Sequence, residues 1–309
     1  MNSIVFTCYD TAVKINSESN KIIEYLIDMF SSYYHIDNKI EADFELSFNI
    51  GIPNKYLYID NERGDYTDNY IIGNNKKIDI YLPYIDDFKL SFVKRIFTTT
   101  FVKTFQKKGY TILHGACAFK EDKGIIITGE AGSGKTTLLQ KLLFEGYGYV
   151  ANDRLAIKND GDNVIVCGIP FSMGIRCNDI RKKINSYSSY YIEEIQKLFL
   201  ENKEVPKYFC VEMKSNIPLS IIVLCAYDKS FEGLKVYKIS NLDERIKNNI
   251  MIENAIPKQK YYLHSIIGMY DRICDLSNFD GIELIQGINS DKETMNQIEN
   301  SITKKRRRC

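Results

Sequence analysis

The glycine-rich loop at residues 129–136 carries residue types and a spacing that bind phosphate. It reads Gly-Glu-Ala-Gly-Ser-Gly-Lys-Thr, a complete G-x-x-x-x-G-K-[ST] pattern. The apolar run Gly124–Thr128 precedes it and the amphipathic run Thr137–Phe144 follows it, which predicts a strand, a turn and a helix. In that order, backbone N–H groups and the positive end of the helix face bound phosphates. The loop is therefore a predicted P-loop (Walker A) that binds a nucleoside triphosphate, although an ordinary glycine-rich turn is the alternative.

Individual side chains of the glycine-rich loop have distinct expected roles. Lys135 is expected to reach the β- and γ-phosphates, and the Thr136 hydroxyl to coordinate Mg²⁺, which prefers oxygen ligands. Thr137 is expected in the helix, facing the phosphates or the core. The predicted nucleotide-binding residues are Gly129, Glu130, Ala131, Gly132, Ser133, Gly134, Lys135, Thr136 and Thr137.

Two further residues could take part in chemistry. Asp153 follows the apolar run Gly146–Ala151, and a carboxylate at such a strand end can hold Mg²⁺ or activate an attacking oxygen. A lone aspartate there is also a common turn former. His114 lies in the strand-like run Tyr110–Phe119, where a single histidine is usually a core residue. From spacing alone, both readings stay open for both residues.

Composition narrows the class of protein. The chain has 309 residues, 44% of them hydrophobic, which is enough for a buried core and for two domains. Its 41 basic and 40 acidic residues give a net charge of +1, so no overall field attracts nucleic acid or an anionic membrane. Apolar stretches such as Leu219–Tyr227 are shorter than the ~20 residues of a membrane span. Since Met1–Asp10 also lacks a targeting pattern, we expect a cytoplasmic protein.

Cysteines and histidines argue against a zinc site. The eight cysteines include no C-x-x-C pair, and the chain has only three histidines. A histidine-based zinc site is therefore not expected, and the thiols are predicted to be reduced and buried.

The chain is expected to contain two domains and a tail. Residues 1–90 alternate short strand-like segments with turn residues and are predicted to form a small α+β domain that could recognise a partner. Residues 91–303 are predicted to form the nucleotide-binding domain, with a mixed sheet flanked by helices. Residues 304–309 form a basic tail, for which a solvated end is the default. The expected helices cover 19–34, 86–107 and 291–302, and the expected strands include 44–50, 55–59, 77–82, 110–119, 124–128, 146–151, 154–158, 164–168, 218–227, 233–240 and 282–286.

The residues around the glycine-rich loop resemble the HPr kinase/phosphorylase family. In that family a histidine precedes the phosphate-binding loop, and an alanine-aspartate-aspartate segment follows the helix after the loop. Here Leu113-His114-Gly115 comes before the loop, and Val150-Ala151-Asn152-Asp153 comes after it, in the same order and at similar spacing. The resemblance covers about Thr111–Lys158 and does not extend to residues 1–90. It implies an α/β, HPr-kinase-like (PEP-carboxykinase-like) P-loop fold and a serine kinase that uses ATP and Mg²⁺.

The resemblance also implies roles for single residues. Asp153 matches the proton acceptor for the substrate hydroxyl, and His114 matches the catalytic-site histidine. Lys135 and Thr136 match the nucleotide and metal positions. Asn152 replaces the first aspartate of the family's pair, which keeps a metal-binding oxygen but removes a negative charge. The implied metal-binding residues are therefore Thr136, Asn152 and Asp153.

A second departure concerns the segment Gly168–Arg176. The bifunctional members of the family carry a glutamate-containing signature there, and this chain has no glutamate in that segment. We therefore hypothesise a kinase without the phosphorylase half-reaction. Arg176 is a candidate for stabilising charge on the transferring phosphoryl group, ranked above Arg154.

The resemblance implies phosphorylation of a Ser or Thr hydroxyl on a small protein or ribosomally made precursor peptide, because some divergent relatives with unrelated N-terminal domains work beside peptide-modifying pathways. Two alternatives stay open. One is a nucleotide-binding switch or slow ATPase in which Asp153 and His114 are structural, and the other is a small-molecule kinase. The acceptor and the oligomeric state, a homo-oligomer included, are not decided by the sequence.

Overall fold

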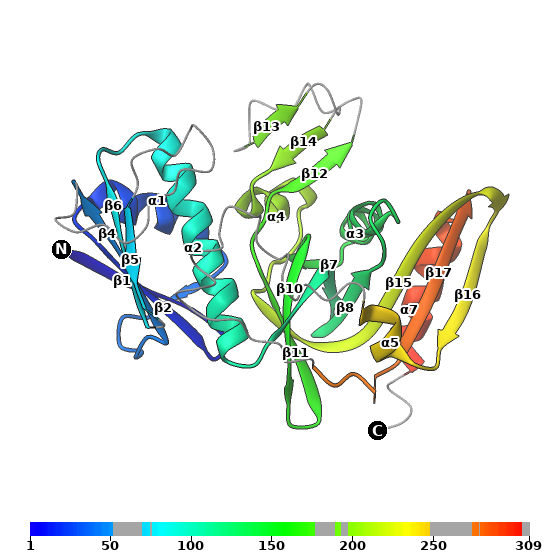
Figure 1. Cartoon of the computed structure of the whole chain (residues 1–309). Helices are drawn as coiled ribbons and strands as arrows, with labels where there is room; N and C mark the ends of the chain where they lie inside the picture. The colour runs from blue at the N-terminus through cyan, green and yellow to red at the C-terminus, as the bar shows by residue number, and fades with distance from the viewer. Residues whose placement is uncertain are drawn as a thin grey trace. The chain divides into compact units, whose positions relative to one another are not determined.

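The described part of the chain forms two compact units. The computed structural model describes residues 1–51, 70–74, 76–176, 189–192, 197–247, 274–277 and 279–304 (Figure 1). The first unit is built from residues up to Thr111, and the second from the described residues that follow. Each unit combines helices with a mixed β-sheet, so the expected α/β architecture is observed.

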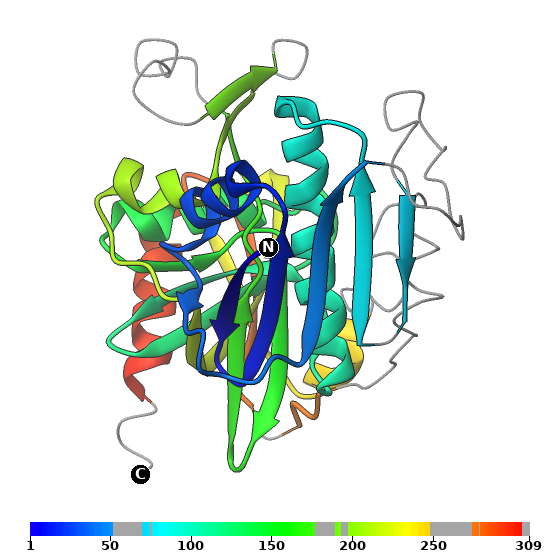
Figure 2. The same ribbon diagram turned by 90° about the vertical axis from the view of Figure 1, so that its left-hand side faces the viewer.

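The first unit contains a six-stranded sheet in the order β3-β1-β2-β4-β6-β5. Its strands are β1 (Asn2–Cys8), β2 (Thr11–Ser17), β3 (His35–Ile36), β4 (Phe44–Ile50), β5 (Tyr70–Gly73) and β6 (Lys77–Leu82). β1 and β2 form an antiparallel hairpin, and β2, β4 and β6 run parallel, side by side in Figure 2. The predicted strands 44–50 and 77–82 are confirmed, whereas the predicted strand 55–59 lies outside the described residues.

Two helices complete the first unit. Helix α1 (Asn20–Phe30) is shorter than the predicted 19–34, because the chain turns at Ser31 and buries the next two tyrosines outside the helix. Helix α2 (Asp87–Lys107) is as predicted. In α2, the Phe97 ring lies 5.0 Å from that of Phe6 and 4.4 Å from that of Phe30, measured between ring centroids. The domain boundary expected at residue 90 therefore falls inside α2, and the first unit continues to Thr111.

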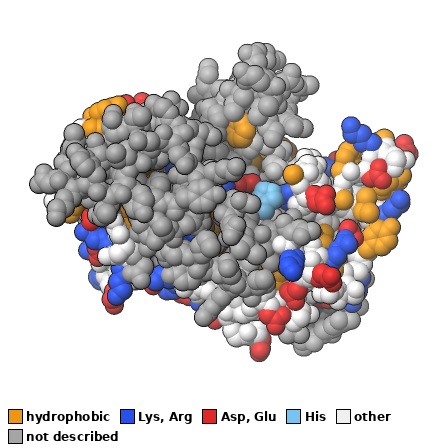
Figure 3. Space-filling view, viewed as in Figure 1, with side chains coloured by type: hydrophobic (Ala, Val, Ile, Leu, Met, Phe, Trp, Pro, Cys, Tyr) orange, Lys and Arg blue, Asp and Glu red, His pale blue; other side chains and the backbone are white. Residues whose placement is uncertain are grey.

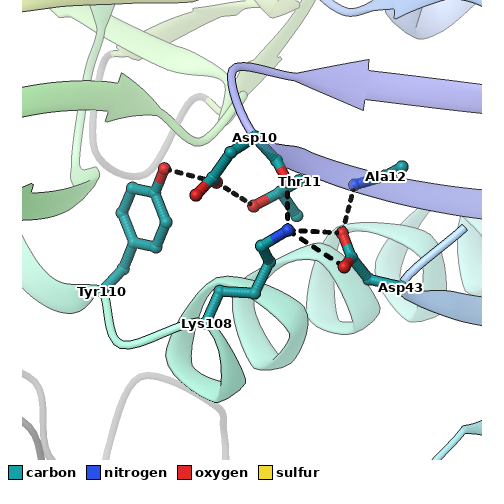
Figure 4. A network of polar contacts seen from close by, with 6 residues as sticks. All are labelled: Asp10, Thr11, Ala12, Asp43, Lys108 and Tyr110. Carbon is teal, nitrogen blue, oxygen red and sulfur yellow. Dashed lines mark hydrogen bonds and ion pairs between the residues drawn. The ribbon is translucent and has the colours of Figure 1, made fainter. Parts of the chain in front are cut away.

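A polar network holds the carboxyl end of α2 to the sheet (Figure 4). Lys108 Nζ lies 3.0 and 3.1 Å from the carboxylate oxygens of Asp43 and also donates to the Asp10 carbonyl. The Tyr110 hydroxyl donates to Asp10 Oδ1 at 2.7 Å, and the Ala12 N–H donates to Asp43 Oδ2 at 2.8 Å. The network thus joins the β1–β2 turn, the start of β4 and the end of α2.

The second unit contains an eight-stranded mixed sheet. The main path runs β11-β10-β7-β8-β15-β17-β16, with β9 paired to β7. Its strands are β7 (Thr111–Lys120), β8 (Lys123–Thr128), β9 (Gly148–Ala151), β10 (Arg154–Asp160), β11 (Asn163–Gly168), β15 (Asn216–Glu232), β16 (Leu234–Ile239) and β17 (Gly281–Ile288). All the predicted strands of this part are observed, with ends that differ by a few residues. β8 is central and parallel to β15, which continues past the end of β8 to Glu232.

Helices cover both faces of this sheet. Helices α3 (Lys135–Phe144), α4 (Val205–Phe209) and α7 (Asp291–Lys304) contribute to one apolar cluster, and α5 (Leu242–Ile246) contributes to another. In β8, Ile125 and Ile127 belong to the first cluster and Ile126 to the second. Since successive strand residues point to opposite faces, the two clusters lie on opposite sides of β8. The continuous apolar run of β8 is explained by this two-sided burial.

A small antiparallel sheet and an exposed edge complete the second unit. The small sheet has the order β12-β14-β13, with β12 (Met173–Arg176), β13 (Ser189–Ile192) and β14 (Lys197–Leu200). Tyr227, Val236 and Tyr237 are exposed on β15 and β16, and Figure 3 shows hydrophobic side chains gathered on that part of the surface. Among the described residues, no helix is long and apolar enough to cross a membrane. The cysteines of the described segments are free thiols, and all except Cys210 are buried.

Candidate functional site

The glycine-rich loop connects the end of β8 to α3 and starts beside Cys225 of β15. Helix α3 begins at Lys135, with Gly134 as its N-cap, so the predicted strand, turn and helix are present. Gly129 adopts a φ of 145°, and a Cβ atom added there would lie 2.5 Å from the Cys225 carbonyl oxygen of β15. A side chain is therefore excluded at the first loop position by the neighbouring strand as well as by backbone conformation.

Lys135 folds back over the glycine-rich loop. Its Nζ donates to the carbonyl oxygens of Gly129 and Glu130, both at 2.8 Å. The side chain is half-buried, and this burial lowers the pKa of the Lys135 ammonium below its ordinary value, while Cys225 and Asp153 oppose the shift. The ammonium is thus held at the loop by carbonyl groups that a phosphate oxygen can replace.

Asn152 and Asp153 form the bend between β9 and β10. Asp153 has a φ of 81°, in the left-handed region that aspartate and asparagine tolerate better than most residues. Its carbonyl oxygen accepts the Gly115 N–H at 3.1 Å, which ties the bend to β7. The Thr136 hydroxyl donates to Asn152 Oδ1 at 3.2 Å. The hydroxyl oxygen of Thr136, in the first turn of α3, therefore lies next to the side-chain oxygen of Asn152 in this bend.

The Asp153 carboxylate has a cationic or ionisable side chain beside each oxygen. His114 Nδ1 lies 3.5 Å from Asp153 Oδ1, and Arg154 Nε lies 3.5 Å from Asp153 Oδ2. His114 Nδ1 also lies 3.1 Å from the Asp153 carbonyl oxygen. Because a carbonyl oxygen can only accept, this contact requires the ring proton on Nδ1 and leaves Nε2 as the acceptor of the neutral ring.

One cavity of about 710 Å³ brings most of the predicted site residues together. Of the predicted set, its walls contain His114, Ala131, Gly132, Gly134, Lys135, Thr136, Thr137, Asn152 and Asp153. Thr137 therefore faces the cavity rather than the core. Gly129, Glu130 and Ser133 do not line it: Gly129 is buried against β15, Glu130 is exposed, and the Ser133 hydroxyl lies 3.6 Å from the Cys225 sulfur.

The sequence-based ranking of the two arginines is not supported by a described contact of Arg176. Arg176 ends β12, but its side chain lies outside the described residues. Arg154, ranked lower, touches the Asp153 carboxylate. Phe171 and Gln140 also line the cavity and were not predicted. In the sequence, only its position next to Asp153 pointed to Arg154 as a site residue. No local sequence pattern pointed to Phe171 or Gln140.

The donor atoms in the cavity fit a hard cation. Thr136, Asn152 and Asp153 all offer oxygen, the ligand type that Mg²⁺ prefers. Within the described segments, no group of three or more His, Cys, Asp and Glu side chains is placed to hold a metal ion. These residues therefore fit a Mg²⁺ ion that is shared with phosphate oxygens and water, rather than one enclosed by protein ligands alone.

Comparisons with known proteins find a distant likeness in structure. No protein-family model matches the chain, and no curated protein matches its sequence. Among solved structures, the chain is similar to the Hpr(Ser) kinase/phosphatase from Coxiella burnetii, with 14% sequence identity and a TM-score of 0.31. The match covers 63% of this chain and 90% of that chain. Because the sequence identity and the TM-score are both low, this likeness carries no argument about the function of the chain.

Proposed function

We propose that this protein is an ATP-dependent kinase that transfers the γ-phosphoryl group to a Ser or Thr hydroxyl of a small protein or ribosomally made precursor peptide. One observation supports the proposal most directly: Asp153 and His114 line the same cavity as Lys135 and Thr136. A phosphate-binding loop serves hydrolysis and switching as well as transfer. A carboxylate and a histidine beside the loop add a place where an acceptor hydroxyl can be oriented and deprotonated.

In the proposed reaction, Asp153 orients the acceptor hydroxyl and accepts its proton. The acceptor oxygen forms a bond to the γ-phosphorus while the bond from that phosphorus to the β–γ bridging oxygen breaks, and ADP leaves with the electron pair. Lys135 and the backbone N–H groups of the glycine-rich loop stabilise the charge on the phosphoryl oxygens. For this contact, Lys135 Nζ exchanges the carbonyl oxygens of Gly129 and Glu130 for phosphate oxygens.

Mg²⁺ would be held by Thr136, Asn152 and Asp153 together with the nucleotide. When bound, the ion would supply positive charge that offsets the negative charge of the nucleotide phosphates. The neutral Asn152 leaves Asp153 as the acidic side chain of the cavity lining, within the part of the chain that the structure describes. One carboxylate can serve as the proton acceptor of the transfer step. Our proposal that the phosphorylase half-reaction is absent rests on the lack of a glutamate in Gly168–Arg176.

The proposal is tested by following the label of γ-labelled ATP in the presence of Mg²⁺. The purified protein is incubated with Ser- and Thr-containing peptides, proteins encoded by neighbouring genes, and free serine, sugars and nucleosides. Asp153→Asn and Lys135→Ala are compared with wild type. Asp162→Asn, which changes an exposed aspartate in the β10–β11 turn, is the matched control.

The destination of the label decides among the three functions. Label on a peptide or protein hydroxyl, lost in both site variants and kept in Asp162→Asn, supports the proposal. If only a small molecule carries the label, the protein is a small-molecule kinase and not a protein or peptide kinase. Release of inorganic phosphate that is unaffected by Asp153→Asn replaces the proposed function with a nucleotide switch or ATPase. Removal of the label by excess phosphate, with pyrophosphate released, contradicts the absence of phosphorylase activity.

A further inference from the structure

We propose that Arg154 is a positioning residue, which holds the Asp153 carboxylate so that Oδ2 is occupied and Oδ1 stays beside His114. The contribution of Arg154 to catalysis rests on the proposed kinase function, because Asp153 is the proton acceptor of that reaction. The placement itself is a property of the folded chain, so it can be tested whether or not the protein transfers phosphate.

The Arg154 guanidinium lies between a charge and an aromatic ring. Its Nε is 3.5 Å from Asp153 Oδ2, and its central carbon is 4.4 Å from the centroid of the Phe171 ring. A planar guanidinium can stack on a ring and still direct its N–H groups at a carboxylate, which a lysine ammonium cannot reproduce. The two contacts limit the directions in which the Arg154 side chain can move.

The β10–β11 hairpin creates this arrangement. Leu155 pairs with Gly168, and beyond that pair the Ile169 N–H donates to the Arg154 carbonyl at 3.2 Å. The chain then passes Pro170 and brings Phe171 back beside the start of β10. Arg154 and Phe171 are therefore set against each other by strand register, although 16 residues separate them in the sequence.

Arg154 has the environment of an internal charge rather than of a solvated surface residue. Its side chain is 17% exposed, and its Nε is buried without a hydrogen bond. Burial lowers the pKa of the guanidinium and Asp153 opposes this change, yet an arginine remains protonated in proteins. Because an isolated buried charge is costly, Asp153 is the partner that makes the position tolerable.

Arg154 acts on Asp153 rather than directly on a ligand. Asp153 and Phe171 line the cavity, whereas Arg154 is not among the described residues that line it. A group outside the cavity is badly placed to touch a transferring phosphoryl group. It is well placed to fix the rotation of a carboxylate that must present one oxygen to a hydroxyl.

The test uses the ring nitrogen signals of ¹⁵N-labelled histidine in the full-length protein. The chain has only three histidines, and His114→Gln assigns the relevant signal. Arg154→Met is expected to change the ¹⁵N chemical shifts of His114, because the Asp153 carboxylate beside His114 loses the guanidinium at Oδ2. Phe171→Leu, which keeps the charge, is expected to change them less. Arg245→Met, which breaks the exposed pair with Glu283, is the matched control and leaves them unchanged.

A double-mutant cycle separates positioning from a merely structural role. In the Asp153→Asn background, Arg154→Met is expected to cause little further movement of the His114 signal, since the residue through which it acts is already altered. An unmoved signal in Arg154→Met, or an equal movement in both backgrounds, overturns the inference. If Arg154→Met does not fold, Phe171→Leu is compared in the wild-type and Asp153→Asn backgrounds. A smaller shift change in the Asp153→Asn background again supports positioning through Asp153.

Kinetics then connect the position to the proposed function. In a protein that transfers phosphate, Arg154→Met is expected to lower kcat about 10- to 100-fold while the nucleotide Kd changes little. If the His114 chemical shift changes but kcat does not, the contribution of Arg154 to catalysis is overturned. Absence of transfer by the wild-type protein contradicts the proposed function, and the histidine signals still decide the placement of Arg154.

Discussion

At the scale of single residues, the resting position of Lys135 has a measurable consequence. The Lys135 ammonium is held by two loop carbonyls in a half-buried place, and burial lowers its pKa from the ordinary value of 10.5. The folded chain therefore binds this proton less tightly than the unfolded chain does. The contribution of Lys135 to the free energy of unfolding therefore rises with pH between the lowered pKa and 10.5, because its unfolded form binds more protons in that window.

We predict that the stability of wild type relative to Lys135→Met increases as the pH rises towards 10.5. The contribution of Lys135 is fully present above the ordinary pKa and is lost as the pH falls through the lowered pKa of the folded protein. Urea unfolding of both proteins at several alkaline pH values measures the difference. Thr136→Val, a non-titrating change at the next residue, is the control and should differ from wild type by a constant amount. A difference for Lys135→Met that shrinks with rising pH would refute the prediction.

The residues of the site differ in how far the sequence could predict them. Lys135 and Thr136 belong to a local pattern, and their placement follows from the strand, turn and helix around them. The Asp153 bend could be expected at a strand end, but its left-handed backbone could not. The Arg154–Phe171 contact depends on the register of the β10–β11 hairpin, which no local pattern specifies.

At the scale of elements, β15 supports the glycine-rich loop. The loop starts with Gly129 packed against the Cys225 carbonyl, and the parallel pairing of β8 with β15 sets that distance. The sequence pattern predicts a glycine here for the sake of the phosphates. The structure adds a reason that operates without any ligand, because the neighbouring strand leaves no room for a Cβ atom.

We predict that Gly129→Ala lowers the free energy of unfolding by about 1–3 kcal/mol even without nucleotide, because an added Cβ meets backbone that must shift. Gly146→Ala is the control. Gly146 has a φ of 80° but nothing within 4 Å of an added Cβ, so only backbone strain is expected, roughly 1 kcal/mol. Urea denaturation of the three proteins measures both changes. Equal losses in the two variants would show that β15 does not constrain the loop.

The polar network at the end of α2 is a second element-scale feature (Figure 4). Lys108 and Asp43 are only about one-quarter exposed, whereas the Lys14–Glu45 pair in the same sheet is more exposed and 3.8 Å apart. Charge-assisted hydrogen bonds in partly buried positions contribute more than exposed ion pairs. The two pairs therefore allow a comparison of a partly buried and a more exposed ion pair within one unit.

We predict that Lys108→Met lowers the free energy of unfolding by about 1.5–3 kcal/mol, since Asp43 loses a charged donor and keeps the Ala12 N–H. Lys14→Met, the control, is expected to cost about 0–1 kcal/mol. In an Asp43→Asn background, the cost of Lys108→Met should become smaller. Chemical denaturation of wild type and the four variants measures these costs, and equal costs for the two lysine variants would count against the network.

At the scale of the whole molecule, the division of the chain depends on helix α2. The alternation of short strand-like segments with turn residues predicts a domain boundary near residue 90, because this alternation ends there. The aromatic residues of the helix that crosses this boundary, α2, pack into the first unit. Composition could not reveal this, since the same apolar stripe would suit either unit. The existence of most elements was predictable from periodicity, whereas their assignment to units required the tertiary contacts.

The position of the boundary gives a final prediction, on fragments of the chain. The Phe101 ring of α2 lies 4.3 Å from that of Tyr34, and Phe97 packs on Phe6 and Phe30. A fragment of residues 1–90 loses both α2 rings, and each such loss costs about 3–5 kcal/mol, comparable to the whole stability of a small domain. We therefore expect residues 1–90 to lack a cooperative thermal transition by circular dichroism, and residues 1–111 to retain one. Phe101→Ala in the longer fragment should lower its midpoint temperature. Cooperative unfolding of the shorter fragment would instead restore the boundary at residue 90 and make α2 dispensable for the first unit.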